Sequence, residues 1–339
     1  MRSVVKIINP YNAGFFGNVL QLGSNENPYE PSENVKKAYL KSLEKINRYP
    51  DAQYNELKEK IAEYIKCSKE NIAIGCGASE LINRVCDCFL EELDEVLIPM
   101  PSYSLYLLYS MLRNARLLTP EFESYEISEK IAEFKPNLTF ICTPNNPTGN
   151  FVKKEIVEIL AERSKYLVLD EAYAEFSEKT NVNLALEKDN VIVLRSFSKF
   201  FGLAGLRIGY AVASKELVEA IEKIRLPFAV SQPALSCAIA ALEDLEYYRK
   251  ISKKIVAERE RLKNELSFLG KIYPSEANFL LIKTDKIKAL DLLKKGIAVR
   301  ELPSLPGLRG YHLRITVGKK EENDLLIKVI SELSNFSTN

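Results

Sequence analysis

Short apolar runs alternate with helical patterns between about residues 71 and 213. The runs are rich in Val, Ile and Leu, and they predict strands at Asn71–Ile74, Glu95–Ile98, Leu138–Cys142, Tyr166–Leu169, Val191–Leu194 and Arg207–Ala213. Helical patterns near Ser79–Leu90, Ser102–Leu112 and Lys153–Arg163 separate several of these runs. Apolar strands that alternate with helices indicate an α/β fold with a mainly parallel sheet covered by helices on both faces.

The pattern is different toward both ends of the chain. Pro31–Ile46 predicts a helix with an apolar face formed by Val35, Tyr39, Leu43 and Ile46. After about Ser231, one long helical stretch to about Leu269 precedes short strands near Asn278–Ile282 and Tyr311–Val317 and a last helix. We therefore expect a large domain over residues 47–235 and a smaller α+β domain over residues 236–339, which the N-terminal segment 1–46 joins.

The composition narrows the class of protein. The chain has 339 residues, 46% hydrophobic and 27% charged, as is typical of a soluble globular protein. A net charge of +1 gives no bulk attraction to nucleic acid or to a membrane surface. Six cysteines without a C-x-x-C pair and a single histidine argue against a metal site. We see no signal peptide and no membrane span, and we expect a cytoplasmic protein.

Three polar motifs follow predicted strands. They are TPNNPTG with Asn146, DEAY with Asp170 and Tyr173, and SFSKFFGLAGLR with Ser196, Lys199 and Arg207. A lysine in an apolar loop beside a sheet suits Schiff-base chemistry, and an Asp at the carboxyl end of a strand lies where open α/β folds bind ligands. Each motif alone also fits a structural interpretation: a solvent-facing lysine, an Asp that caps the next helix, or a Pro/Asn turn.

In this order, the three motifs resemble those of the fold-type I pyridoxal 5′-phosphate (PLP) enzymes of the aspartate aminotransferase superfamily. The resemblance implies that Lys199 carries PLP as a Schiff base and then acts as the base that moves the substrate proton. It implies that Asp170 pairs with the pyridine nitrogen of the cofactor. Asn146 and Tyr173 would hydrogen-bond the oxygen on the cofactor ring.

The same resemblance implies a phosphate site. Ser196 and Arg207 match residues that hold the cofactor phosphate, Arg207 through charge-assisted hydrogen bonds. Ala78 and Ser79 lie in GCGASE, which follows a strand and opens a helix, and the free N–H groups of such a turn suit a phosphate. Tyr103 matches the aromatic residue that stacks on the PLP ring. Without the other motifs, GCGASE would be interpreted as an ordinary Gly-rich turn and Tyr103 as a core residue.

Shorter segments lie outside these motifs: PY ending at Tyr11, SNENPY around Asn25, NRYP around Tyr49 and HLRITVG around Arg314. They resemble segments of the histidinol-phosphate aminotransferase family. The resemblance implies that Tyr11 and Asn25 bind substrate, Tyr11 through the substrate phosphate. It also implies a homodimer in which Tyr49 reaches the PLP phosphate of the neighbouring subunit.

Two arginines fit an anionic substrate. Arg314 lies in a predicted strand, Leu313–Val317, where an arginine is unusual unless it binds an anion. Arg300 precedes a loop rich in Pro and Gly and matches a second arginine of the family. Together they would clamp the phosphate of L-histidinol phosphate and, in the second half-reaction, a carboxylate of glutamate. Surface ion pairs are the structural alternative for both.

The implied reaction is a ping-pong transamination of L-histidinol phosphate with 2-oxoglutarate, which yields imidazole-acetol phosphate and glutamate in histidine biosynthesis. Two related activities stay open, a threonine-phosphate decarboxylase and an aromatic or aspartate aminotransferase of broad specificity. A transcription regulator with a PLP fold would carry an additional DNA-binding domain, and the chain has neither room for one nor a basic patch.

Overall fold

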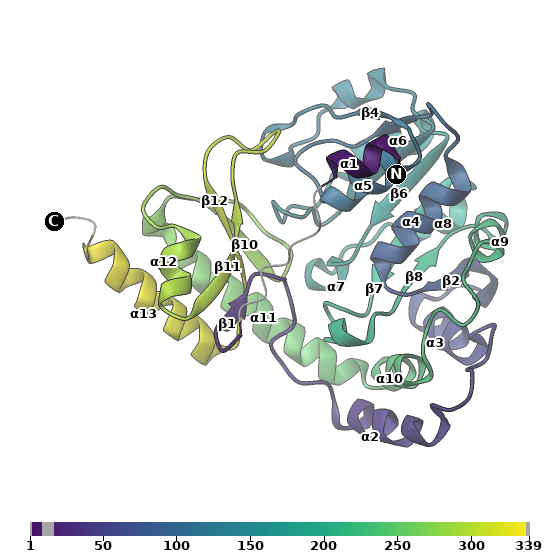
Figure 1. Cartoon of the computed structure of the whole chain (residues 1–339), viewed down its shortest axis with the longest axis horizontal. Coiled ribbons are helices and arrows are strands. Elements are labelled where there is room, and N and C mark those ends of the chain that lie inside the picture. The colour runs from purple at the N-terminus through teal and green to yellow at the C-terminus, as the bar shows by residue number, and fades with distance from the viewer. Residues whose placement is uncertain (1, 9–16, 337–339) are drawn as a thin grey trace.

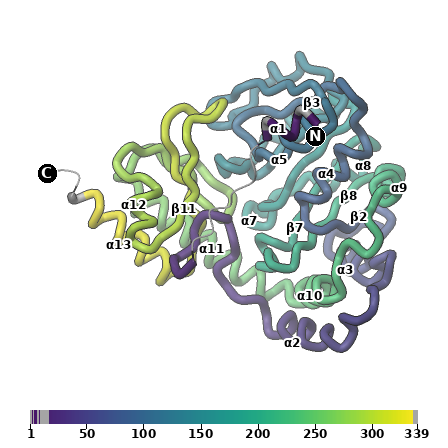
Figure 2. The backbone as a smooth tube through the Cα atoms, in the orientation of Figure 1, coloured from purple at the N-terminus to yellow at the C-terminus, as the bar shows by residue number. Residues whose placement is uncertain are grey.

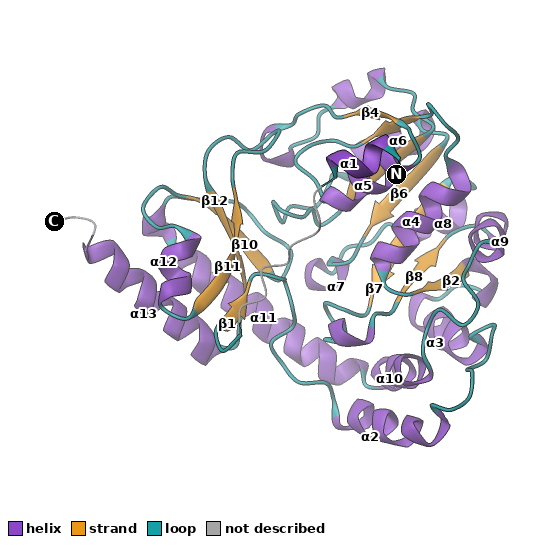
Figure 3. Cartoon of the chain, in the orientation of Figure 1, coloured by secondary structure: helices purple, strands orange, loops and turns teal. Residues whose placement is uncertain are grey.

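A seven-stranded sheet forms the middle of the larger part of the molecule (Figures 1 and 3). The computed structural model describes residues 2–8 and 17–336. In spatial order, the strands of this sheet are β2 (Ile72–Gly75), β8 (Gly209–Val212), β7 (Val191–Ser196), β6 (Tyr166–Asp170), β5 (Leu138–Cys142), β3 (Glu95–Leu97) and β4 (Arg116–Leu118). Of these seven strands, β8 alone runs in the direction opposite to that of the other six. The prediction of an α/β fold with a mainly parallel sheet is therefore confirmed.

Both faces of this sheet are buried. In β6, Leu167 and Leu169 belong to one core cluster, whereas Val168 between them belongs to another. The first cluster includes side chains of α3 (Asn55–Ile65), α6 (Lys154–Arg163) and α8 (Val182–Glu187). The second includes side chains of α4 (Ala78–Phe89), α5 (Ser104–Leu112) and α9 (Lys215–Lys223). Apolar residues at successive positions of a strand serve both layers of helices, which explains the continuous apolar runs.

A second, smaller sheet combines the C-terminal part of the chain with one N-terminal strand. Its order is β1 (Leu20–Leu22), β11 (Ile297–Leu302), β12 (His312–Thr316), β10 (Phe279–Lys283) and β9 (Lys271–Ile272). β1 pairs in parallel with β11, and the other pairs are antiparallel. Figure 2 shows the purple N-terminal tube beside β11 and α11. α12 (Ala289–Lys294) contacts β11 of this sheet, and α13 (Lys320–Phe336) contacts α12 and α11.

Some predicted element boundaries are wrong. The long helical stretch after Ser231 is two helices, α10 (Gln232–Glu243) and α11 (Leu245–Glu265), which are separated at Asp244. Asp is a weak helix former because its side chain competes for nearby backbone N–H groups. The strand expected from Arg207 begins at Gly209, because Arg207 has a left-handed backbone with a φ of 50°. The domain boundaries near residues 46 and 235 stay a prediction.

The other elements are α1 (Ser3–Ile7), α2 (Glu33–Ser42), α7 (Ala174–Ser177) and the 3₁₀ turns η1 (Leu43–Lys45), η2 (Lys69–Asn71), η3 (Glu123–Tyr125), η4 (Glu129–Glu133), η5 (Ala204–Leu206) and η6 (Ser267–Leu269). The helix predicted near residues 31–46 is α2, and it packs against α10. Val35 on its predicted apolar face is buried, but Tyr39, Leu43 and Ile46 are 43%, 44% and 60% exposed. Within the described residues, no helix has the length and apolar character required to cross a membrane.

Candidate active site

A cavity of about 420 Å³ lies where residues of both sheets meet. Its lining includes residues that the sequence predicted for cofactor or substrate: Asn25, Ala78, Ser79, Tyr103, Asn146, Asp170, Tyr173, Ser196, Lys199, Arg207, Arg300 and Arg314. The volume is in the range of small-molecule sites. These residues come from segments far apart in the chain, and the fold brings them together in one cavity.

Lys199 lies in this cavity just after β7. Its Nζ donates a hydrogen bond to the carbonyl oxygen of Ser24 at 2.9 Å and lies 5.8 Å from the ring centre of Tyr173. Burial, together with the smaller effect of the nearby positive charge of Arg314, lowers the pKa of Lys199 to about 8. A lysine with this pKa is partly neutral near physiological pH, which is the form that attacks a carbonyl carbon.

Asp170 is the last residue of β6 and is buried. Its Oδ2 accepts a hydrogen bond from the hydroxyl of Tyr106 at 2.7 Å, and its Oδ1 accepts one from the backbone N–H of Ala172 at 3.1 Å. Burial raises the pKa of Asp170, and the hydrogen bond from Tyr106 partly offsets this effect. Sequence reasoning missed Tyr106, although its position three residues after Tyr103, in a stretch predicted to be helical, was a usable signal.

A second polar group lies near Lys199. The Nδ2 of Asn25 donates to the hydroxyl oxygen of Tyr173 at 3.0 Å, and burial raises the pKa of Tyr173. Asn25 has a positive φ of 53°. Its backbone is held by Thr316, whose Oγ1 accepts from the Asn25 N–H at 2.9 Å, and by Asn278, whose Nδ2 donates to the Asn25 carbonyl at 3.1 Å. Sequence reasoning did not predict that Thr316 and Asn278 hold the N-terminal segment.

The first turn of α4 forms one end of the cavity. Ala78 and Ser79 are its first residues, and their N–H groups are among those that a helix leaves without an internal partner. Gly77 precedes them with a φ of +82°, and a Cβ there would lie 2.8 Å from Nη2 of Arg207. A side chain at Gly77 would thus displace the arginine that the sequence predicted to bind phosphate.

Serines of the β7 loop complete this end of the cavity. Ser196 and Ser198 both line it, and Nη1 of Arg207 donates to Oγ of Ser198 at 3.3 Å. Sequence reasoning named Ser196 and missed Ser198. The alternation of serines in the SFSK sequence could have indicated it, because both flank the same short loop.

Arg300 and Arg314 face the cavity from adjacent strands. They are directly opposite each other in the antiparallel pair of β11 and β12. Arg314 donates from Nη1 to Oδ1 of Asn146 and from Nη2 to the carbonyl of Gly23, both at 2.6 Å. Like charges at directly opposed positions destabilise a sheet, so this arrangement favours an anion between or beside the two guanidinium groups.

Three predicted aromatic residues have different outcomes. Tyr103 lines the cavity and packs edge-to-face on Tyr106, with ring centres 5.6 Å apart. Tyr49 lies outside the cavity lining, 79% exposed, and stacks on Phe228 with ring centres 4.3 Å apart. Tyr11 lies outside the described residues, so its predicted contact with the substrate phosphate is not tested.

The chemistry of the cavity fits PLP. A buried carboxylate, Asp170, suits a protonated pyridine nitrogen, and the lowered pKa of Lys199 suits a covalent bond to the cofactor aldehyde. The start of α4 with Arg207 suits a phosphate. Gly209 keeps this end open, because a Cβ there would lie 2.8 Å from the backbone nitrogen of Ala78.

Comparisons with known proteins agree with this site. The family model of class I and II aminotransferases matches residues 17–330. The chain therefore belongs to the class I and II aminotransferase family, and its fold is that of an aspartate-aminotransferase-like enzyme.

The similar proteins narrow this class. Histidinol-phosphate aminotransferase 2 of Archaeoglobus fulgidus is 53% identical over 98% of this chain and 100% of its own length. Histidinol-phosphate aminotransferase of Methanocaldococcus jannaschii is 34% identical over 98% and 97% of the two chains. The crystal structure of histidinol-phosphate aminotransferase from Sinorhizobium meliloti, in complex with PLP, matches with a TM-score of 0.89 and 27% identity over 99% and 98% of the chains. The resemblance to histidinol-phosphate aminotransferases that the sequence predicted is confirmed.

Proposed function

We propose that this chain transaminates L-histidinol phosphate with 2-oxoglutarate, using PLP bound at Lys199. The observation that carries the proposal is the pair Arg300 and Arg314, opposed on β11 and β12 and facing the cavity of Lys199. Such a pair suits a substrate whose anionic group lies apart from its amine, as in histidinol phosphate. It also suits the second carboxylate of 2-oxoglutarate, so one site serves both half-reactions. The names of the relatives support this choice over the decarboxylase and over broad-specificity aminotransferases.

Each residue has a distinct task in this proposal. Bound PLP would supply an electron-accepting ring that stabilises negative charge at the substrate Cα. The carboxylate of Asp170 would stabilise the positive charge of the protonated pyridine nitrogen. The hydrogen bond from Tyr106 keeps that carboxylate oriented. The lowered pKa of Lys199 raises the neutral fraction of its Nζ, and in that neutral form the Nζ would take up the proton from the substrate Cα.

The remaining residues position and bind. Asn146 and Tyr173 would hydrogen-bond the ring oxygen, and Tyr103 would stack on the ring. Ala78, Ser79, Ser196 and Arg207 would hold the phosphate, and we add Ser198 to this group because it contacts Arg207. Asn25 lies against Tyr173 and is placed to contact the substrate.

We further propose that two copies of the chain form the working enzyme. The apolar side chains of Tyr39, Leu43 and Ile46 lie partly exposed, beside Leu40, which is 64% exposed. Exposed apolar side chains grouped on one surface are typical of interaction sites. Tyr49 follows directly and is exposed as well, so a second subunit that covers this surface would meet it.

The decisive experiment mixes the PLP-loaded protein with L-histidinol phosphate alone. We expect the absorbance of the lysine-bound cofactor to be replaced by that of pyridoxamine phosphate, and added 2-oxoglutarate to reverse the change. The overall balance is one amino group moved from histidinol phosphate to 2-oxoglutarate, without loss of carbon. A parallel sample with threonine phosphate is assayed for carbon dioxide. Release of carbon dioxide there, with no response to histidinol phosphate, would replace the aminotransferase by the decarboxylase.

A further inference from the structure

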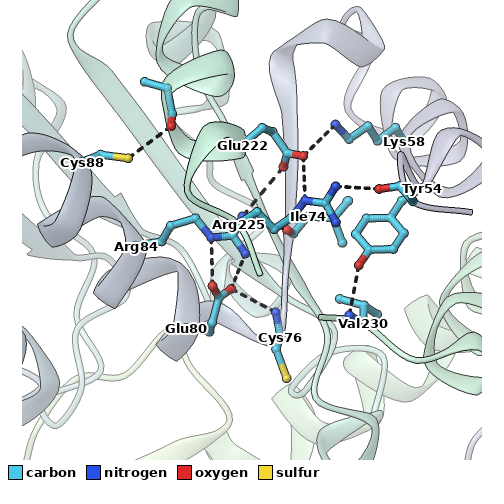
Figure 4. Close-up of polar contacts among 12 residues, drawn as sticks. Tyr54, Lys58, Ile74, Cys76, Glu80, Arg84, Cys88, Glu222, Arg225 and Val230 are labelled. Atoms are coloured by element: carbon cyan, nitrogen blue, oxygen red, sulfur yellow. Dashed lines mark hydrogen bonds and ion pairs between the residues drawn. The ribbon is translucent and has the colours of Figure 1, made fainter. Parts of the chain in front are cut away.

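A cluster of charged side chains lies outside the cavity, between α3, α4 and α9 (Figure 4). We call it the Glu222 cluster; its members are Lys58, Glu80, Arg84, Glu222 and Arg225. These side chains are largely shielded from solvent: Arg84 is 2% exposed, Arg225 10%, Lys58 13% and Glu222 17%. Charged groups that are this shielded are costly unless they are paired, so their arrangement calls for an explanation.

Glu222 is the carboxylate that joins the three cations of the cluster. Its Oε2 lies 3.0 Å from Nε of Arg225 and 3.6 Å from Nζ of Lys58, and its Oε1 lies 3.8 Å from Nη1 of Arg84. The pKa of Lys58 is lowered by burial, while the charge of Glu222 acts in the opposite direction. Without Glu222, the three positive charges would face one another in a poorly solvated space.

One arm of the cluster leads to the first turn of α4. Arg84 forms two hydrogen bonds with the carboxylate of Glu80, from Nε at 2.8 Å and from Nη2 at 2.6 Å. Glu80 in turn accepts a hydrogen bond from the backbone N–H of Cys76 at 3.1 Å. Arg84 also donates to the carbonyl of Ile74 at 3.1 Å. These contacts hold the turn just before Ala78, which is the proposed phosphate-binding turn.

The other arm leads to the loop of Tyr49. Arg225 donates from Nη2 to the carbonyl of Ala52 at 2.6 Å, and its guanidinium lies 4.6 Å from the ring centre of Tyr54. The hydroxyl of Tyr54 accepts from the N–H of Val230 at 3.1 Å. The segment between Arg225 and Val230 is thus held at both ends, and it contains Phe228, on which Tyr49 stacks.

We propose that Glu222 is a positioning residue for the cofactor phosphate, because it holds the phosphate-binding turn of α4 and the loop of Tyr49 in one frame. The inference rests on the proposed function, in which PLP occupies the cavity of a two-subunit enzyme, and on the contact that the resemblance implies between Tyr49 and the phosphate of the neighbouring subunit. Glu222 itself is absent from the cavity lining. It acts through Arg84 on the subunit's own site and through Arg225 on the loop offered to the partner.

The test compares PLP with pyridoxal, which lacks the phosphate, in titrations of the apoenzyme followed by absorbance. Glu222→Gln keeps the shape of the side chain and removes its charge. We expect the dissociation constant of PLP to rise about tenfold, the lower end of what residues that orient direct ligands contribute in metal sites. The dissociation constant of pyridoxal should stay within about twofold, because no phosphate contact is involved. Glu219→Gln is the matched control on the same helix, since Glu219 is 58% exposed, and it should change neither constant.

A double-mutant cycle with Tyr49→Phe tests the second arm. Tyr49→Phe should weaken PLP binding in the wild-type background and have little further effect when Glu222 is already Gln, because the loop is then no longer aligned. If Tyr49→Phe weakens PLP binding equally in the wild-type and the Glu222→Gln background, the two effects are additive and the proposal is overturned. The proposal is also overturned if Tyr49→Phe has no effect on PLP binding in the wild-type background. Equal weakening of PLP and pyridoxal, or no weakening of either, would overturn it too.

Two precautions keep the result decisive. If Glu222→Gln does not fold, Arg225→Gln interrupts the arm to Ala52 and takes its place with the same expected pattern. If the wild-type apoenzyme forms no Lys199-linked chromophore with PLP, the proposed function itself fails. A wild-type enzyme that binds PLP normally, with variants that violate the pattern, rejects the role of Glu222 alone.

Discussion

The ionisation of Lys199 offers the most direct test of how the cavity prepares its chemistry. Burial, with the positive charge of Arg314 as the next contribution, lowers the pKa of this amine from an ordinary 10.5 to about 8. At pH 7.5, a lysine with this pKa is neutral in about a quarter of the molecules, against about 0.1% for an ordinary lysine. The reactive form of Lys199 is therefore expected to be roughly two hundred times more abundant than that of an exposed lysine.

The perturbation is Arg314→Met, which keeps a long side chain and removes the charge. Because the cation disfavours a second positive charge nearby, its loss should raise the pKa of Lys199. Burial stays, so the new pKa of Lys199 should lie between about 8 and the ordinary 10.5. At pH 7.5, the neutral fraction of Lys199 should fall accordingly, whereas Arg314→Lys should preserve the wild-type value.

Competitive labelling of the apoenzyme with acetic anhydride measures this ionisation. The extent of labelling of Lys199 is followed by mass spectrometry between pH 6 and pH 11, and Lys154, whose side chain is 80% exposed, serves as the reference in the same digest. The labelling of Lys199 should rise with pH through a midpoint near 8. A wild-type midpoint at or above 10, or a downward shift in Arg314→Met, would refute the electrostatic reasoning.

Three further substitutions test other parts of the structure. Arg195→Met leaves two buried carboxylates, Glu171 and Glu175, without the guanidinium that lies 2.9 Å and 2.8 Å from them, and should lower the free energy of unfolding by about 3–5 kcal/mol in urea denaturation. Gly77→Ala places a Cβ 2.8 Å from Arg207 at a φ of +82°, and should weaken PLP binding about tenfold in absorbance titrations. Arg314→Ala would remove the charge-assisted hydrogen bonds that we propose for both substrates, and should lower kcat/KM about 10- to 100-fold in each half-reaction by stopped-flow absorbance.

Each of these has a matched control. Lys215→Met removes an exposed partner of Glu219 and should change the free energy of unfolding by less than about 1 kcal/mol. If it lowers this free energy as much as Arg195→Met does, the burial of the Arg195 ion pairs does not explain their contribution. Gly296 has a φ of +81°, but a Cβ there would meet open space. If Gly296→Ala weakens PLP binding as much as Gly77→Ala does, the clash with Arg207 is not the cause of the effect at Gly77. Arg309→Ala changes an exposed arginine of the same part of the chain and should leave turnover unchanged. If Arg314→Ala turns over as fast as this control, Arg314 does not bind the anionic group of the substrates.

Much of the central fold and of the cofactor end of the site could be predicted from the sequence. Apolar runs at β5, β6 and β7 identified strands because both faces of a parallel sheet are buried and most positions of its strands are then apolar. Asp170 and Lys199 could be found because functional groups follow such strands at the carboxyl edge of the sheet. The edge strand β1 and its neighbour β11 were missed, because short strands of mixed polarity have no pattern that distinguishes them from loops.

The sequence by itself therefore determined the groups on which the proposed chemistry rests: a lysine in an apolar loop, a carboxylate at the end of a strand and turns that suit a phosphate, each encoded by a few neighbouring residues. Only the tertiary structure decided how distant residues cooperate. It placed Arg300 opposite Arg314, Tyr106 against Asp170, and Glu222 between the turn of α4 and the loop of Tyr49. Such contacts depend on strand register and helix packing, which are set by the burial of the whole core rather than by local sequence.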